Sequence, residues 1–164
     1  MICVPKKEKK AQHLSFISIL GGILLMGVSS VLGYKVVFQL IAAALIVTGI
    51  QLLVRFVLSD FRYIIDDRDD GSAELFIYKK QGRRDELVCR ISLSRVTEFY
   101  ERGTKKHDAN MRYNYTQNLF AKGYSLIFAD GDKNTEIIIE PDTSFINAIN
   151  ARIGVGEGDF GFMM

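Results

Sequence analysis

Two long apolar segments without a charged residue decide what this chain can fold into. They are residues 14–33, LSFISILGGILLMGVSSVLG, and residues 36–54, VVFQLIAAALIVTGIQLLV. A helix rises about 1.5 Å per residue, so some 20 residues cover the roughly 30 Å hydrocarbon core of a bilayer. Each segment is long enough to span a membrane, and the short link between them predicts two antiparallel helices packed side by side.

A cleaved signal peptide is the competing interpretation of the first segment, because KKEKK at residues 6–10 precedes it like the basic start of such a peptide. However, the apolar stretch is longer than the usual signal-peptide core, lacks an A-x-A-like cleavage site and is followed almost at once by the second segment. We therefore predict a transmembrane hairpin at residues 14–58, with helices at 14–33 and 36–58.

Basic residues set the expected orientation of this hairpin. Four lysines lie in the N-terminal segment 1–13 and two arginines flank the end of the second helix, whereas the link holds one lysine; these are Lys6, Lys7, Lys9, Lys10, Arg55, Arg62 and Lys35. Positive charge is retained on the cytoplasmic side of membranes. We expect a multi-pass protein of the cell membrane with its N-terminus and its C-terminal domain in the cytoplasm.

The charge divides along the same boundary. Before residue 59 the chain has six Lys or Arg and one acidic residue, and after it 15 Lys or Arg and 18 Asp or Glu, giving +5 and −3. A basic anchor and a mildly acidic domain follow from this division. Nucleic acid is not expected as a partner of an acidic domain.

Small residues in both apolar segments, among them Gly22 and Gly49, let helix backbones approach closely. Packing within the hairpin and self-association through its remaining faces both account for them. The segments hold no ionisable residue at mid-span, so a transport pathway is not indicated.

From residue 59 the apolar pattern changes to the two-residue period of strands. Seven strands are predicted, at 61–67, 74–80, 86–92, 95–101, 111–118, 123–129 and 134–140. Residues 142–153 then place Phe145, Ile146, Ile149 and Ile153 on one helical stripe, with Asp142 or Thr143 available as cap. Residues 59–153 form the predicted domain, and 154–164 read as a flexible tail.

The motif DDRDDG at residues 66–71 separates the first two predicted strands and resembles a calcium loop. In that alignment Arg68 occupies a position that needs an oxygen ligand, and Ile77 stands where a bidentate Glu belongs. Asp70-Gly71 is instead a strong signal for a hairpin turn. We predict a turn here and no metal site.

The stretches CRISLSRVTEFYE, at 89–101, and YSLIFADGDKNTEIIIEPDTSFINAI, at 124–149, resemble bacterial pleckstrin-homology-like (PH-like) families in which the domain follows a membrane hairpin. The resemblance implies seven antiparallel strands closed by one C-terminal amphipathic helix, together with membrane attachment. It implies no catalytic residues, and fold alone does not settle function.

Residues suited to catalysis are sparse. His13 at the membrane boundary and His107 in a charged loop are expected to be solvated, and no nucleophile, nucleotide-loop or metalloprotease motif occurs. We expect neither enzymatic activity nor a cofactor. Cys89 is predicted to be a buried reduced thiol, whereas an unmodified thiol and acylation both stay open for Cys3.

Two functional hypotheses remain. The first is a non-catalytic module that presents its domain at the cytoplasmic face for protein binding or assembly. The alternative is an anionic-lipid or headgroup sensor that uses basic loops around 79–84 and 102–112. The candidate membrane-facing residues are Lys79, Lys80, Arg83, Arg84, Lys105 and Lys106, with Arg102 and Arg112 beside them.

Overall fold

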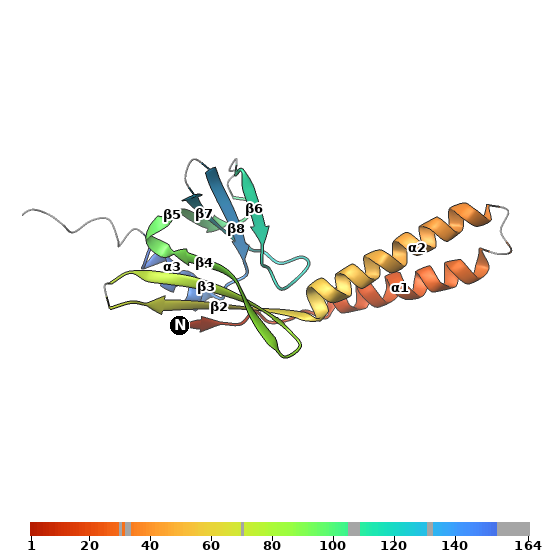
Figure 1. The fold of residues 1–164 in the computed structure, drawn as a ribbon, viewed down its shortest axis with the longest axis horizontal. Coiled ribbons are helices and arrows are strands. Elements are labelled where there is room, and N and C mark those ends of the chain that lie inside the picture. Colours follow the sequence, from red (N-terminus) through yellow and green to blue (C-terminus); the bar gives the residue numbers. More distant parts are fainter. Residues whose placement is uncertain (30, 32–33, 70, 105–108, 131–132, 154–164) are drawn as a thin grey trace, which may run out of the picture. The chain divides into compact units, whose positions relative to one another are not determined.

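The structure is a computed structural model that describes residues 1–29, 31, 34–69, 71–104, 109–130 and 133–153 (Figure 1). It divides into two compact units. Residues 7–60 form one, which we call the helical unit; residues 1–6 and the chain from Phe61 onward form the other, the β unit. The predicted tail at 154–164 lies outside the described residues.

The helical unit consists of α1 (Lys10–Val28) and α2 (Lys35–Leu52), with the π-helical turn η1 (Leu53–Val57) continuing α2. The two helical stretches, of 19 and 23 residues, are long and apolar enough to cross a membrane. Their large side chains are mostly uncovered: Ile17 is 67% exposed, Leu24 68% and Leu40 67%. A core helix of a soluble protein buries such residues, so this surface calls for an apolar surrounding.

Close contact between α1 and α2 depends on two glycines. A Cβ added at Gly22 would lie 2.6 Å from Cγ1 of Ile46, and one at Gly49 would lie 2.6 Å from Cγ1 of Ile19. Both distances are below 3.0 Å, a separation from a non-bonded heavy atom that real Cβ atoms essentially never show. The small residues at these two positions are therefore explained by packing within the hairpin.

We predict that Gly22→Val destabilises the hairpin by about 1–3 kcal/mol, because the added carbons force the helices apart. Gly21→Val is the matched control, since a Cβ at Gly21 meets nothing within 4 Å. Unfolding of each full-length variant in mixed micelles of mild and denaturing detergent measures the difference. Equal stability of the two variants would contradict the packing described.

The described residues of the β unit form eight strands in two four-stranded sheets (Figure 1). The first sheet has the order β1-β2-β3-β4, with β1 (Ile2–Cys3), β2 (Ser59–Asp67), β3 (Ala73–Gln81) and β4 (Arg84–Ser92). The second has the order β5-β7-β8-β6, with β5 (Val96–Glu101), β7 (Tyr124–Asp130), β8 (Lys133–Ile139) and β6 (Met111–Asn114). A 3-10 turn, η2 (Leu93–Arg95), connects them.

The prediction of seven antiparallel strands was wrong in two respects. β1 is an eighth strand, and at two residues it is too short to show a period. β6 pairs with β8 in parallel, Met111 opposite Thr135 and Asn114 opposite Ile138. The connection after β6 leads to β7, which lies on the other side of β8 and runs antiparallel to it, so the chain enters β8 in the direction of β6. The seven predicted strands are present as β2 to β8, but the one predicted at 111–118 ends at Asn114, and residues 115–118 belong to the loop that follows.

Alternating side chains of both sheets form one hydrophobic core. Tyr63, Leu75, Ile137 and Ile139 are at most 1% exposed within it. The C-terminal helix α3 (Thr143–Asn150) is shorter than the predicted 142–153 and adds Phe145 and Ile149, both fully buried.

The first residues of the chain belong to the same unit as its C-terminal part. β1 pairs antiparallel with β2, Ile2 opposite Ile64 and Cys3 opposite Tyr63, and Ile65 donates from its amide to the Met1 carbonyl at 2.8 Å. The hairpin is thus an insertion between two neighbouring strands. A hairpin that crosses a membrane twice returns the chain to the side where it began.

We predict that neither cysteine of the folded protein reacts readily with a maleimide near neutral pH. Cys3 is 3% exposed, and burial raises the pKa of its thiol; burial also raises the pKa of the half-buried Cys89 thiol to about 11. The reactive thiolate is therefore scarce at both positions. Labelling followed by mass spectrometry checks this, with urea-unfolded protein as control; rapid native labelling of Cys3 would contradict the pairing of β1.

Candidate functional site

The acidic motif between β2 and β3 is a turn, as predicted. Gly71 has φ +80°, its amide donates to the Arg68 carbonyl at 3.0 Å, and the Arg68 amide donates to the Ser72 carbonyl at 2.8 Å. A side chain in this left-handed conformation would be strained, which explains the glycine. Among the described residues no group of three or more His, Cys, Asp or Glu is placed to hold a metal ion.

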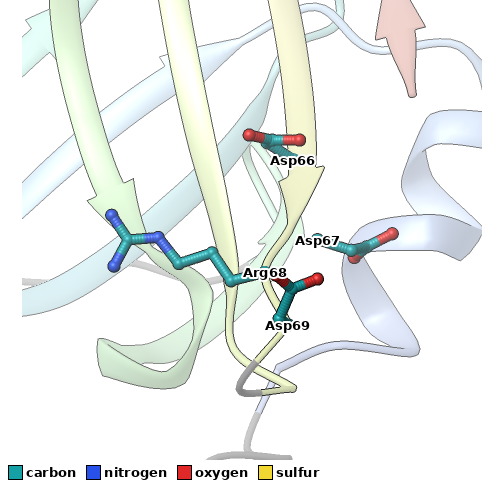
Figure 2. A pocket seen from close by; sticks show the side chains of 4 residues that line it. All are labelled: Asp66, Asp67, Arg68 and Asp69. Atoms are coloured by element: carbon teal, nitrogen blue, oxygen red, sulfur yellow. The ribbon is translucent and has the colours of Figure 1, made fainter.

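Asp66, Asp67, Arg68 and Asp69 line an open pocket at this turn, and two of these side chains are directed to opposite sides. Figure 2 shows Asp67 directed toward the C-terminal helix and Arg68 directed away from it, toward the neighbouring strands. Asp67 accepts from Arg152 Nε at 2.6 Å and from Nη2 at 2.8 Å, and this guanidinium lowers the pKa of the Asp67 carboxyl. Arg68 bonds Glu74 at 3.0 Å. The turn therefore fastens β2 to the residues after α3 and to β3.

The predicted basic loop 79–84 forms the hairpin between β3 and β4. The strand register sets Lys79 opposite Glu86 and Lys80 opposite Asp85, and Gly82 makes the turn with φ +62°. Directly opposite residues point to the same face of a sheet. Two of the four predicted cations of this hairpin thus face carboxylates, one of which, Asp85, also binds Arg62. Arg83 and Arg84 are exposed at the turn, and residues 79–86 keep a net charge of +2.

The second predicted basic cluster is only partly described. Lys105 and Lys106 lie outside the described residues. Arg112 bonds the buried carboxylate of Glu136, which also accepts from Ser125 Oγ at 2.6 Å. The structure does not bring Arg112 together with the basic hairpin as one cationic surface, because its guanidinium is directed to the outer side of the second sheet.

A different set of residues gathers on the outer side of the first sheet, opposite the core. We call it the arginine face. It comprises residues of β2, β3, β4 and the turn between β2 and β3, namely Arg62, Arg68, Glu74, Phe76, Tyr78 and Arg90. Successive side chains of a strand point to opposite faces of the sheet. Because Ala73, Leu75 and Ile77 of β3 point into the core, the residues between them point to the outer side.

Glu74 is the centre of this face. Its side chain is only 12% exposed and lies between Arg68 and Arg90. Arg90 donates from Nε to Glu74 Oε2 at 2.9 Å and from Nη2 to Oε1 at 3.2 Å, a two-bond contact that fixes the guanidinium plane. The same guanidinium lies over the Phe76 ring, 5.4 Å from its centroid.

A second stack repeats the arrangement further along β3. The Arg62 guanidinium lies 5.5 Å from the centroid of the Tyr78 ring and donates to Asp85 Oδ2 at 2.8 Å. Tyr78 is opposite Leu87, which is 46% exposed although apolar. Two arginine–aromatic stacks and one exposed leucine therefore share this side of the sheet.

Such a face is suited to binding a protein. Arginine and aromatic residues are enriched at the energetic centres of interfaces, since they combine large contact area with several donors. Arg62 and Arg90 are 40% and 51% exposed, so each guanidinium is held in place yet still reachable. Their ordering within the free protein lowers the entropy lost on binding.

Sequence reasoning missed the arginine face because it grouped cations by proximity along the chain. The members of the face come from three strands, and only their register brings them together. The available signal was the alternation in ELFIYKK, which sets Glu74, Phe76 and Tyr78 on one side of the strand.

Comparisons of the chain with protein-family models, with curated proteins and with solved structures gave no match.

We predict that Glu74→Gln lowers the free energy of unfolding by about 1–2 kcal/mol, because two guanidiniums lose their shared, largely buried carboxylate. Glu86→Gln is the matched control, an exposed carboxylate on the neighbouring strand that is expected to change stability by less than about 0.5 kcal/mol. Urea unfolding followed by far-ultraviolet circular dichroism measures both. Indistinguishable midpoints would show that Glu74 does not organise this face.

Proposed function

We propose that this chain is a non-catalytic, multi-pass protein of the cell membrane that presents the arginine face of its β unit to a protein partner in the cytoplasm. The observation that carries the proposal is the pair of arginine–aromatic stacks, Arg62 on Tyr78 and Arg90 on Phe76, on one accessible side of the first sheet. The partner surface should carry carboxylates next to an apolar contact, since guanidiniums and Leu87 are what this face offers.

Membrane anchoring is supported by the length and apolar surface of α1 and α2. The insertion of the hairpin between β1 and β2 supports an arrangement in which the N-terminus and the β unit share one side. The four lysines at residues 6–10, against one in the link, favour the cytoplasm as that side. The PH-like assignment belongs to the proposal, and two mainly antiparallel sheets with a C-terminal helix support it.

The lipid-sensing alternative finds less support. Lys79 and Lys80 lie opposite Glu86 and Asp85, so two of the four cations of the hairpin 79–84 face carboxylates, and its attraction for an anionic headgroup is reduced to that of a net charge of +2 on residues 79–86.

Site-specific photo-crosslinking in native membranes tests the protein-binding proposal. A photoreactive phenylalanine analogue in place of Tyr78 should yield one discrete crosslinked protein, and the same analogue in place of Tyr113, an exposed tyrosine of the second sheet, should not. Combining the Tyr78 probe with Arg62→Ala and Arg90→Ala should weaken capture at least about tenfold, because interface arginines of this kind contribute strongly.

Crosslinking only to lipid, or capture that survives both arginine substitutions, would contradict the proposal. Circular dichroism of each variant confirms that the sheets are intact before the yields are compared.

A further inference from the structure

The connection between β6 and β7, residues 115–123, contacts both points at which the chain passes between the β unit and the hairpin. The Asn118 side-chain amide donates from Nδ2 to the Lys6 carbonyl at 2.7 Å. The Phe61 amide donates to Gln117 Oε1 at 2.8 Å. Lys6 is the last residue of the β unit before the hairpin and Phe61 the first after it. The loop therefore lies beside both crossings.

The stem of this loop is fixed by Glu140, which follows β8. Its carboxylate accepts from the Gln117 amide at 3.1 Å, the Asn118 amide at 3.0 Å and the Asn118 side chain at 2.7 Å. Gln117 is 1% exposed and Asn118 6%. At the other end, a Cβ at Gly123 would lie 2.9 Å from Ile138 Cγ2, so the backbone is held against β8. Both ends of the loop are tightly attached.

The tip of the loop has the opposite character. Phe120 is 71% exposed, the half-buried Leu119 precedes it, and the exposed Lys122 follows. A single exposed apolar residue is ordinary on a protein surface. The Phe120 ring differs from such a residue because its loop has a fixed, buried stem. The loop therefore cannot fold over the ring, and the ring stays exposed at the surface.

Chain connectivity limits how far this ring lies from the bilayer. A chain spans at most about 3.5 Å per residue, so Phe61 lies within about 10 Å of Leu58, at the end of the second span, and Phe120 within about 10 Å of Gln117. Gln117 is bonded to Phe61. Summed along this path, these limits keep the tip within roughly 25 Å of the end of the second span, which allows it to reach the headgroup layer, where aromatic rings concentrate.

We propose that the tip formed by Leu119 and Phe120 inserts into the interfacial layer of the bilayer next to the hairpin, with Lys122 and Lys6 facing lipid phosphates. The tip is a third membrane contact, which limits rocking of the β unit about its two crossings. This inference rests on the proposed spanning hairpin. It assigns a lipid surface to the β6–β7 loop, which is not one of the predicted basic loops.

Tryptophan fluorescence of the full-length protein in vesicles of phosphatidylcholine and phosphatidylglycerol tests this inference. The chain contains no Trp, so Phe120→Trp places a single reporter at the tip. We expect blue-shifted emission and about twofold quenching by lipids brominated near the headgroup end of their chains, since interfacial side chains enter about 5–10 Å into that layer. Aqueous iodide should quench weakly.

Two matched single-Trp variants make every outcome decisive. Asp69→Trp lies in the turn at the far end of β2 and should show water-exposed emission, open to iodide and unaffected by brominated lipid. Leu24→Trp, on the outer surface of α1, should be quenched by brominated chains if the hairpin spans.

If Leu24→Trp is quenched and Phe120→Trp behaves like Asp69→Trp, the loop does not touch lipid and the inference fails while the anchor stands. If Leu24→Trp is not quenched, the spanning hairpin fails and the inference with it. A Phe120→Trp reporter shielded from both quenchers is covered by protein, which also overturns the inference.

Discussion

The Glu140 carboxylate makes the interaction on which the rest of the β unit depends. It gathers three N–H groups of Gln117 and Asn118, and those two side chains in turn bind the backbone at Phe61 and Lys6. Buried polar groups are costly unless each finds a partner, and here one carboxylate provides a partner for three N–H groups of the loop. Through this loop the end of β8 is joined to Lys6 and Phe61, the residues of the β unit that flank the inserted hairpin.

The hairpin is inserted between β1 and β2, so the chain leaves the β unit and returns to it between two paired strands. β1 adds to the first sheet only two residues, yet they hold the N-terminus in the same unit as the C-terminal strands. Two chain segments rather than one consequently connect the β unit to the hairpin. This connection and the fixed arginine face are the two features on which the proposed protein-binding role at a membrane rests.

Much of this architecture could be predicted from the sequence. The uncharged runs indicated both helices, and alternation of apolar and polar residues indicated the strands from β2 to β8. A strand that buries one face places apolar residues at every second position, and this pattern can be read from the sequence. Alternation reports the face of a residue but not its neighbour, so the parallel pairing of β6 was not visible. β1 is too short for any period, and its partner lies beyond the hairpin. Gln117 and Asn118 look like surface residues until their bonding partners are known.

The claim that matters most is that the hairpin crosses the membrane and returns the β unit to the cytoplasmic side. Labelling of intact cells with a membrane-impermeant maleimide tests it, using Tyr34→Cys in the link and Asp69→Cys in the β2–β3 turn, against the background of the two shielded native thiols. The account predicts labelling of Tyr34→Cys from outside and of Asp69→Cys only after the membrane is opened. Labelling of both from outside, or of Asp69→Cys alone, would contradict it.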